Sequence, residues 1–468
     1  MTACGLCGSW CRRLWCRQYW SWRWRGTRPK QAGSILCFAM QGFIHVVDGR
    51  FVDDSCREFL FHGWNGWKLL ANAMSNPSSI TEQFQQAQEA GLNLMRFFIA
   101  DDESGPTFLR GPTDFDEKAA QALDFIVAEA GRLGIRLTPV LLNTWKAPNG
   151  IPSFEKWCGT AGSSTRPRPD IDPRGSGPLS PLERLQTPYD WLMSPKCRQQ
   201  VKDYFSVIIN RRNSITGVLY RDDPTIFSWD LLNEPRCKYC GPEAVDSWYA
   251  EMSAHLKSID PNHMVTTGAE GFFVEGDAYE DLDPGTDYLM WGPRSGQDFR
   301  ANHAHPGIDY AVIHMWVDNW LVGDSQDWGR RWIESHMQAA SELGKPLVME
   351  EFGKASPESQ ISSVRDPWFD MVQSEVEQSL QAGDALRGAL FWQWDGPWGE
   401  TEPRGPDSNL VRRRDSTFTA HITPFAKGLA DQSGQPVAGC TPRVGPAGGS
   451  AGAPAVTTFD ASKPASSD

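Results

Sequence analysis

The stretches Trp229-Asp-Leu-Leu-Asn-Glu-Pro235 and Leu347-Val-Met-Glu-Glu-Phe-Gly353 decide the fold expected for this chain. Each begins as an apolar run typical of a buried strand and ends abruptly in a carboxylate. Each carboxylate is followed by residues that stop a strand, Pro235 in the first case and Phe352-Gly353 in the second. The two stretches therefore predict two strands with acidic side chains at their carboxyl ends.

Similar strand-like runs alternate with segments of helical periodicity along most of the chain. Eight strands are expected, near residues 59–63, 92–99, 135–142, 226–232, 263–267, 310–315, 346–351 and 388–394. Helices are expected between them at 80–90, 116–133, 195–212, 243–258, 325–343 and 366–382. The alternation predicts a parallel sheet with right-handed crossovers, and eight such units predict an α/β fold of the (β/α)8 TIM-barrel type. No Gly-x-Gly-x-x-Gly follows a strand, which argues against a doubly wound nucleotide-binding fold.

The chain of 468 residues is expected to divide into an atypical N-terminal segment, one barrel domain and a tail, at residues 1–41, 42–432 and 433–468. The first segment is rich in Cys, Arg and Trp and is a possible targeting sequence. The tail is rich in Pro, Ala, Gly and Ser and is expected to be disordered. A short hairpin with Asp48-Gly49 as its turn should precede the barrel. Residues 160–187 should form a long loop on the barrel rim.

Composition narrows the class of partner. The net charge of −13 argues against nucleic acid, which needs a basic face. No apolar run approaches the roughly 20 residues of a membrane helix, so no membrane partner is expected. The 21 Trp against 9 Tyr suit a carbohydrate cleft, since aromatic rings stack on sugar C–H faces. Core packing is the alternative explanation. The sequence gives no indication of the oligomeric state.

Cysteine spacing argues against a metal centre. Five of the 11 Cys lie in the N-terminal segment, and the others are scattered. Cys237-Lys-Tyr-Cys240 has C-x-x-C spacing, but no second Cys or His pair stands at zinc-site spacing. We expect a local disulfide or two free thiols there, and neither a metal nor another cofactor.

The two terminal carboxylates are candidates for acid and nucleophile. Such a pair can cleave a glycosidic bond when one group protonates the leaving oxygen and the other attacks the sugar. Glu234 is the expected acid/base, and a second carboxylate nearby should raise its pKa. Glu351 is the expected nucleophile, kept ionised by Arg96 from the second strand. Glu350 is the rival, because neighbouring residues on a strand point to opposite sides and only one can face the barrel mouth.

Other polar and aromatic residues also follow strands, where the working residues of such barrels stand. Asn233 is expected to bond a sugar hydroxyl, and His314 the acid or the sugar, although a structural histidine is an equal alternative. Trp394 is expected to form a platform under the reacting sugar, with core packing as the alternative. The remaining candidates for substrate binding are Trp64, Trp145, Glu270, Trp316 and Trp320.

Several longer motifs resemble the plant-type endo-β-1,4-mannanases of glycoside hydrolase family 5. They are Ala90-Gly-Leu-Asn-Leu-Met-Arg96, Asn213-Ser-Ile-Thr-Gly217, Arg221-Asp-Asp-Pro-Thr-Ile-Phe227, Leu232-Asn-Glu-Pro-Arg-Cys237, Gly268-Ala-Glu-Gly-Phe272, Asp318-Asn-Trp320 and Glu351-Phe-Gly-Lys354. The resemblance covers about residues 42–432. It implies Glu234 as acid/base and Glu351 as nucleophile of a retaining enzyme, with the other candidates around the substrate.

The resemblance implies a secreted enzyme of polysaccharide catabolism that hydrolyses β-1,4-mannosidic bonds in mannan, glucomannan or galactomannan. A related β-glycanase, a mannan transglycosylase and a catalytically impaired carbohydrate-binding protein are the alternatives. One departure stands at Trp316, where the family has a Tyr whose hydroxyl contacts the nucleophile. An indole can only donate a hydrogen bond, through its nitrogen.

Overall fold

The computed structural model describes residues 42–99, 108–145, 150–161, 189–237, 240–284, 292–320, 322–323, 325–402, 405 and 408–443. All of them belong to one unit, which extends from Phe38 to the end of the chain. Residues 1–41, most of the expected rim loop at 160–187 and the tail beyond 443 lie outside the described residues, so these expectations stay predictions.

Eight parallel strands form the central sheet, as predicted. They are β3 (Phe61–Gly66), β4 (Leu94–Phe98), β7 (Arg136–Val140), β8 (Ser228–Asp230), β9 (Met264–Thr266), β10 (Ala311–Met315), β11 (Leu347–Phe352) and β12 (Leu386–Phe391). Their order is β10-β11-β12-β3-β4-β7-β8-β9. Between the two end strands, the Asp309 amide donates to the Val265 carbonyl at 2.9 Å and the His314 amide to the Glu270 carbonyl at 3.0 Å. The sheet is therefore a nearly closed barrel.

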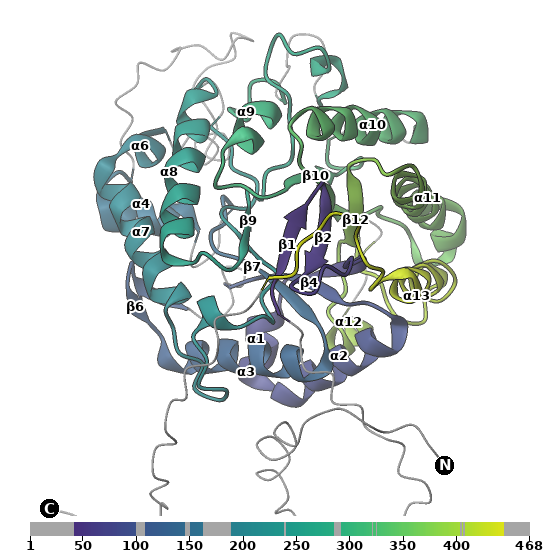
Figure 1. Cartoon of the computed structure of the whole chain (residues 1–468), viewed down its shortest axis with the longest axis horizontal. Helices are drawn as coiled ribbons and strands as arrows, with labels where there is room; N and C mark the ends of the chain where they lie inside the picture. Colours follow the sequence, from purple (N-terminus) through teal and green to yellow (C-terminus); the bar gives the residue numbers. More distant parts are fainter. Residues whose placement is uncertain are drawn as a thin grey trace, which may run out of the picture. The chain divides into compact units, whose positions relative to one another are not determined.

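Helices surround this barrel, as Figure 1 shows. They are α1 (Leu69–Ser75), α2 (Pro77–Ala90), α3 (Glu117–Leu133), α4 (Ile151–Cys158), α6 (Tyr189–Met193), α7 (Pro195–Ile209), α8 (Glu243–Ile259), α9 (Phe299–Ala304), α10 (Gln326–Glu342), α11 (Asp366–Ala382), α12 (Pro397–Thr401) and α13 (Thr423–Gln432). Local sequence fixes many of the helix ends. For example, the Asp116 side chain accepts from the Ala119 amide at the start of α3, and Gly134 ends that helix at φ 75°.

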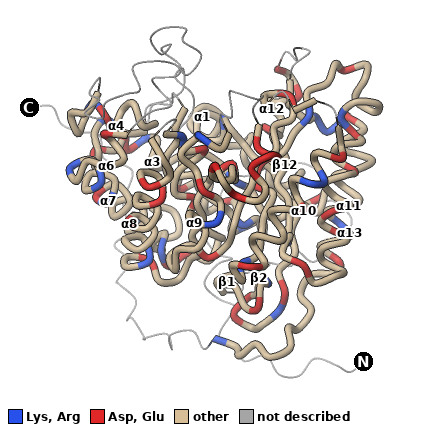
Figure 2. The backbone as a smooth tube through the Cα atoms, turned by 90° about the horizontal axis from the view of Figure 1, so that it is seen from above, with Lys and Arg blue, Asp and Glu red and all other residues tan. Residues whose placement is uncertain are grey.

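A hairpin of β1 (Ile44–Val47) and β2 (Arg50–Asp53) covers the amino-terminal mouth of the barrel (Figure 1). Figure 2 shows the hairpin at one end and α1 and α12 at the other. Phe51 packs inside the barrel, 5.3 Å from the Phe227 ring and 5.4 Å from the Tyr310 ring. Burying such a ring stabilises the fold by about 1.5–3 kcal/mol. The hairpin therefore closes this end, and only the carboxyl ends of the strands remain for a site.

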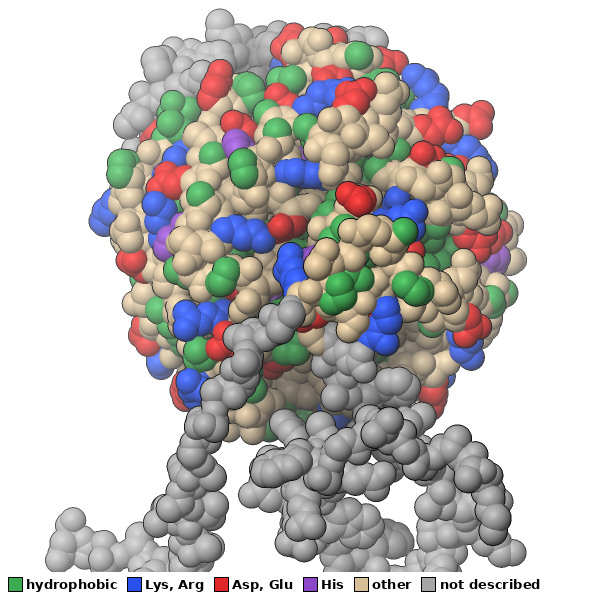
Figure 3. Space-filling model, viewed as in Figure 1, with side chains coloured by type: hydrophobic (Ala, Val, Ile, Leu, Met, Phe, Trp, Pro, Cys, Tyr) green, Lys and Arg blue, Asp and Glu red, His purple; other side chains and the backbone are tan. Residues whose placement is uncertain are grey.

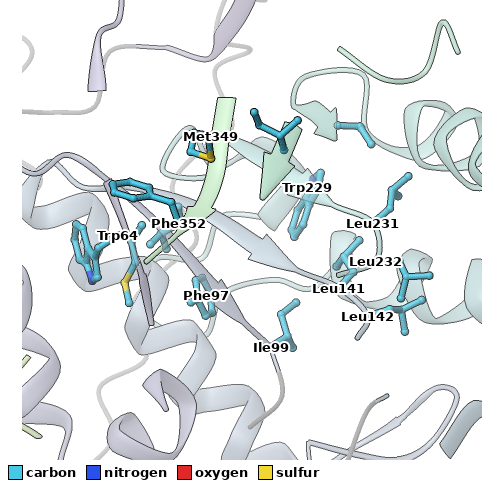
Figure 4. Close-up of a cluster of buried hydrophobic side chains, with 14 of the residues drawn as sticks. Trp64, Phe97, Ile99, Leu141, Leu142, Trp229, Leu231, Leu232, Met349 and Phe352 are labelled. Atoms are coloured by element: carbon cyan, nitrogen blue, oxygen red, sulfur yellow. The ribbon is translucent and has the colours of Figure 1, made fainter. Parts of the chain in front are cut away.

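A second hydrophobic layer fills the space between strands and helices. It follows from the alternation of side chains along each strand, since Leu94 and Arg96 of β4 face the barrel interior while Met95 and Phe97 face the helices. Figure 4 shows part of this layer, with Trp64, Phe97 and Phe352 on their strands. Acidic and basic side chains are intermixed on the outer face in Figure 3. None of the described helices is long and apolar enough to cross a membrane.

Three disulfides join six described cysteines: Cys56–Cys440, Cys158–Cys197 and Cys237–Cys240. The first joins residues 384 positions apart and ties the segment after the hairpin to the segment after α13. The last shows which of the two alternatives for the C-x-x-C spacing holds, a local disulfide and not two free thiols. It follows Glu234 by three residues and adds a covalent constraint beside the site.

Candidate active site

Acidic, basic and amide side chains converge inside the carboxyl-terminal mouth of the barrel. Arg96 comes from β4, His314 from β10 and Glu351 from β11, while Asn233 and Glu234 follow β8. All five are nearly or fully buried. The backbone of Glu234 has φ 49°, a left-handed conformation that costs free energy in a non-glycine residue and often marks functional positions. The protein therefore holds Glu234 in place against its local preference.

Glu234 and Glu351 meet beside the Nδ1 atom of His314. One oxygen of each carboxylate and one ring nitrogen of His314 all lie within 4.8 Å of one another. His314 Nδ1 is 3.0 Å from Glu234 Oε1 and 3.6 Å from Glu351 Oε2. The predicted meeting of these two residues, far apart in sequence, is thus present in the structure. The separation is short enough for both carboxylates to reach one sugar.

Arg96 organises the nucleophile side of the site. Its guanidinium donates to Glu351 Oε1, to Asn233 Oδ1 at 2.8 Å and to Asn65 Oδ1 at 3.1 Å. A further bond of 2.8 Å runs from its Nε to Asp230 Oδ2, deeper in the barrel. The arrangement agrees with the predicted partnership between Arg96 and Glu351. It also fixes Asn233, which in turn donates to Asn143 Oδ1 at 3.1 Å.

Glu350 joins the same cluster, contrary to the expectation that only one of the two neighbouring glutamates faces inward. Its carboxylate lies 3.4 Å from Arg96 Nε and 3.6 Å from His314 Nε2. The cause is an irregularity in the sheet, because the β11–β12 register shifts between Met349 and Phe352 and the β10–β11 register shifts beside His314. Such a shift interrupts the regular alternation of side chains. Strict alternation was therefore the wrong assumption at this point.

Charge in the site is arranged differently from the prediction. Burial opposes protonation of His314, but Glu351, Glu234 and Glu350 outweigh it and raise the pKa of His314 to about 10. Burial also raises the pKa of Glu234, yet the His314 charge and hydrogen bond, with Arg236 and Trp145, lower it to about 2. The expected rise in the pKa of Glu234 is therefore wrong for the free protein. Burial instead raises the pKa of Glu351, against the opposing charges of His314 and Arg96. At neutral pH the proton rests on His314.

Two tryptophans and one arginine complete the set of side chains around the carboxylates of Glu234 and Glu351. Trp145 Nε1 donates to Glu234 Oε2, and Trp316 Nε1 donates to Glu351 Oε2 at 3.2 Å. Arg236 lies over the Trp145 ring at 5.1 Å and pairs with Glu270, its Nε 2.9 Å from Oε2. Glu270 thus lies beside the acid, where it holds Arg236. Its Oε2 also accepts a hydrogen bond of 2.9 Å from Gln297 Nε2. Trp316 thus supplies a hydrogen-bond donor to Glu351, where the sequence resemblance led us to expect a tyrosine hydroxyl.

Three predicted substrate contacts are not at the site. Trp64 and Trp394 are both 0% exposed and pack on each other at 5.7 Å, between the barrel and the helices. Trp394 also contacts Phe418 at 5.1 Å. Trp320 is 5% exposed and packs on Phe272 and Trp332. The platform role of Trp394 and the binding role of Trp64 are therefore wrong, because both side chains face the helices. Trp320 forms part of the supporting core.

Sequence reasoning missed Trp392, Arg236 and Asp230. Trp392 is partly exposed, and its ring lies 5.8 Å from Trp316 and 6.0 Å from Trp67. It comes directly after Phe391, where β12 ends, so it was two residues nearer the true strand end than Trp394. Asp230 could have been found from the alternation of β8, since Ser228 and Asp230 share the inward face. No sequence signal singled out Arg236 beyond its position after Glu234-Pro235.

Glu234, His314 and Glu351 also form the one set among the described residues whose donor atoms have the spacing of a metal site. A cation would meet the guanidinium of Arg96 and the protonated imidazole of His314 there. Glu351 already accepts hydrogen bonds from Arg96 and Trp316, and Glu234 accepts one from Trp145. The donor set fits proton transfer and attack on a sugar better than it fits metal coordination.

Comparisons with known proteins agree with this geometry. The model of the GH family 5 beta-mannosidase-like family matches residues 41–405. Mannan endo-1,4-beta-mannosidase 1 of Solanum lycopersicum is 33% identical over 370 residues, which cover 77% of this chain and 85% of that protein. Mannan endo-1,4-beta-mannosidase 4 of Oryza sativa subsp. japonica is 33% identical over 365 residues, or 75% of this chain and 73% of that protein. The endo-1,4-beta-mannanase structure from Rhizomucor miehei has a TM-score of 0.63 at 26% identity, covering 83% of this chain and 100% of that one.

Proposed function

We infer that this chain, which belongs to the GH family 5 beta-mannosidase-like family, hydrolyses internal β-1,4-mannosidic bonds of mannan-type polysaccharides. The assignment of a glycosidase mechanism rests on one observation. Glu234, His314 and Glu351 lie together, with one carboxylate oxygen or ring nitrogen of each within 4.8 Å of those of the other two. A short separation of the two carboxyl groups favours a retaining mechanism, because an inverting enzyme needs room for a water between them.

In the proposed mechanism Glu351 attacks the anomeric carbon, while Glu234 donates a proton to the oxygen of the departing sugar. Arg96 and Trp316 hold one oxygen each of the Glu351 carboxylate, so the nucleophile is oriented before the substrate arrives. Attack forms a covalent glycosyl-enzyme. Glu234 then takes a proton from water, which attacks the anomeric carbon and releases Glu351. Asn233, fixed by Arg96, is placed to bond a hydroxyl of the reacting sugar.

The proton for the leaving oxygen comes from the His314–Glu234 pair. In the free protein His314 holds it, 3.0 Å from Glu234. When Glu351 forms its bond to the sugar, it loses the negative charge that does most to keep His314 protonated. The imidazole then yields its proton to Glu234 more readily, and Glu234 passes it to the leaving oxygen. Proton donation is thereby coupled to nucleophilic attack.

The decisive experiment is incubation of the purified protein with mannan, glucomannan and cellulose, followed by sizing of the products. We expect short manno-oligosaccharides from mannan and from glucomannan. Glu351→Ala and Glu234→Gln should each lose at least about a hundredfold in kcat, the scale of general acid–base catalysis. Glu375→Gln, a buried carboxylate on α11 outside the site, is the matched control and should keep full activity. Cleavage of cellulose but not of mannan would overturn the substrate assignment.

The stereochemistry has its own test. Proton NMR of the first products should show the β-anomer before mutarotation, because two inversions restore the configuration. An initial α-anomer would refute Glu351 as a covalent nucleophile and would leave the overall activity in place. Binding of mannan without any cleavage would instead favour a carbohydrate-binding protein.

We also propose that the enzyme works outside the cytosol. The support is the set of three disulfides, which persist in oxidising compartments and are rare in the cytosol. Mass spectrometry of the native protein after alkylation should find these six cysteines unmodified. Alkylation of all six in protein isolated from its cells would contradict the proposal.

A further inference from the structure

Glu350 is a buried carboxylate that the mechanism above does not use. It is buried, and its carboxylate lies beside Nε2 of His314, whereas Glu234 and Glu351 lie beside Nδ1 of the same ring. The backbone carbonyl of Glu350 accepts from Asn65 Nδ2 at 2.9 Å, which fixes the strand beside it. Among the described groups, its Oε2 and the Nε2 of His314 are buried without a hydrogen-bond partner, although they face each other at 3.6 Å. A buried charge in this position calls for an explanation.

We propose that Glu350 is a positioning residue, which holds Arg96 and His314 from the barrel interior so that both cations face the catalytic carboxylates correctly. This proposal rests on the proposed roles of Glu234 and Glu351. Glu350 acts through the two cations and does not touch the substrate.

Arg96 pairs with Asp230, Glu350 and Glu351, and His314 pairs with Glu234, Glu350 and Glu351, so Glu350 and Glu351 are the two carboxylates that both cations share. Arg96 lies between Glu351, which it bonds through Nη1, and Glu350, whose Oε1 is 3.4 Å from its Nε. His314 lies between the same two residues, with Nδ1 3.6 Å from Glu351 Oε2 and Nε2 3.6 Å from Glu350 Oε2. The opposing nitrogens of each cation are therefore engaged on opposite sides. Without Glu350, His314 would be attracted only toward Glu234 and Glu351, whereas Asp230 would still hold Arg96 from deeper in the barrel.

The register shift in β11 is what makes the arrangement possible. In a regular strand, Glu350 and Glu351 would point to opposite faces, and one of them would enter the helical layer. The shift between Met349 and Phe352 lets both carboxylates reach the interior. The irregularity thus has a specific consequence, since it supplies an inner and an outer anion from two adjacent residues.

His314 is the group through which the effect can be measured. The charged groups that face it are Glu234 after β8, Glu350 and Glu351 on β11, Asp230 on β8 and Glu270 after β9, with Arg96 bound to the same carboxylates. Neutralising Glu350 removes one of the anions that keep the imidazole protonated. His314 should then lose its proton at lower pH. The supply of a proton to Glu234, and with it the activity, should therefore be lost at lower pH than in the wild-type protein.

The test compares Glu350→Gln, Glu350→Asp and the control Glu375→Gln with the wild-type protein. ¹⁵N NMR of protein labelled in its 9 histidines follows the titration of His314, assigned with a His314→Gln spectrum. In Glu350→Gln we expect the His314 titration and the alkaline limb of kcat/KM to move down by at least about one pH unit, a tenfold change in proton affinity. At the acidic end of the profile kcat/KM should stay within about threefold of wild type. Glu350→Asp, which keeps the charge, should recover most of the shift.

The results separate this proposal from the proposed function. A wild-type protein inactive on mannan would overturn the function, while the NMR titration would still test Glu350. If Glu350→Gln is folded and its His314 titration coincides with that of wild type, Glu350 does not hold the imidazole. If Glu350→Gln fails to fold, Glu350→Asp carries the test. Because Asp keeps the charge but has a shorter side chain, we then expect a small downward move of the His314 titration and a rate loss that grows with pH, and a rate loss equal at all pH values would overturn the proposal.

Discussion

Replacing Arg96 by Met should cost the protein much of its stability, and the cost should depend on pH. Met fills most of the volume of the side chain but carries no charge. The guanidinium is 0% exposed and contacts Asp230, Glu350 and Glu351, which are equally buried. Removing one partner of a buried ion pair typically costs about 3–5 kcal/mol, because the other charge stays behind without compensation. Unfolding free energies of whole domains are only about 5–15 kcal/mol.

The pH dependence follows from the direction of the pKa shifts. With Arg96 present, burial raises the pKa of Asp230 to about 7. Burial also raises the pKa of Glu351 above its usual value. Without Arg96 the pKa values of both carboxyl groups rise further above those of the unfolded chain. The folded variant then binds more protons than the unfolded one, so its stability decreases as pH rises. One extra proton retained by the folded state corresponds to about 1.4 kcal/mol for each pH unit. The unfolding free energy of the variant should therefore fall by about 3 kcal/mol between pH 5.0 and pH 7.5, which is more than the wild type loses, so the destabilisation is smaller at pH 5.0.

Urea unfolding followed by tryptophan fluorescence at the two pH values measures this difference. Arg211→Met is the matched control, because Arg211 also forms a two-bond pair, with Asp124, at 2.9 and 2.8 Å. Asp124 keeps hydrogen bonds from Tyr220 and Ser214 in that variant, and the pair lies outside the site. The control should lose stability with little pH dependence and keep its activity. An equal destabilisation by Arg96→Met at both pH values would refute the electrostatic reasoning.

Three further predictions follow from the same contacts. The double variant Cys56→Ser/Cys440→Ser should lower the free energy of unfolding by up to about 6 kcal/mol, because the disulfide closes a loop of 384 residues, and denaturant unfolding measures the loss. Trp316→Phe removes the 3.2 Å donor to Glu351 and should lower kcat about 10–100-fold, the worth of a hydrogen bond to a charged group, while Trp316→Tyr restores part of it in the same assay. Trp392→Ala should raise KM for manno-oligosaccharides more than tenfold, whereas Trp394→Phe should lower the melting temperature and leave KM unchanged, with the reverse result contradicting the placement of the two side chains.

The fold was predictable because its signals are local. The buried strands are short apolar runs, the helices have a clear apolar face, and features such as Asp116 and Gly134 mark helix ends in the sequence itself. Such patterns depend on neighbouring residues and on no contact across the molecule. All eight strands could therefore be located, and their alternation with helices left one architecture that fits the length of the chain.

The site was predictable only where strand alternation is regular. Arg96, Asn233, Glu234, His314 and Glu351 could be assigned because each stands at the end of a strand whose inward face can be counted. Counting inward-facing residues along the strand gave the wrong result for Trp394, because β12 ends at Phe391. It also gave the wrong result for Trp64, because Asn65 is the residue of β3 that faces inward. It failed again at Glu350, where a register shift depends on the pairing of three strands. The charge of His314 was equally hidden, because it arises from three carboxylates brought together only by folding.

The described chain begins and ends at almost the same place. The Phe43 amide donates to the Asp54 side chain at 3.0 Å, and the Arg443 amide donates to the Asp54 carbonyl at 2.9 Å. Segments about 400 residues apart in sequence therefore meet beneath the barrel, on the end opposite the catalytic mouth. A short peptide linker could join them, and the polypeptide could be reopened at an exposed helix–strand connection to give a circularly permuted enzyme with its cleft intact.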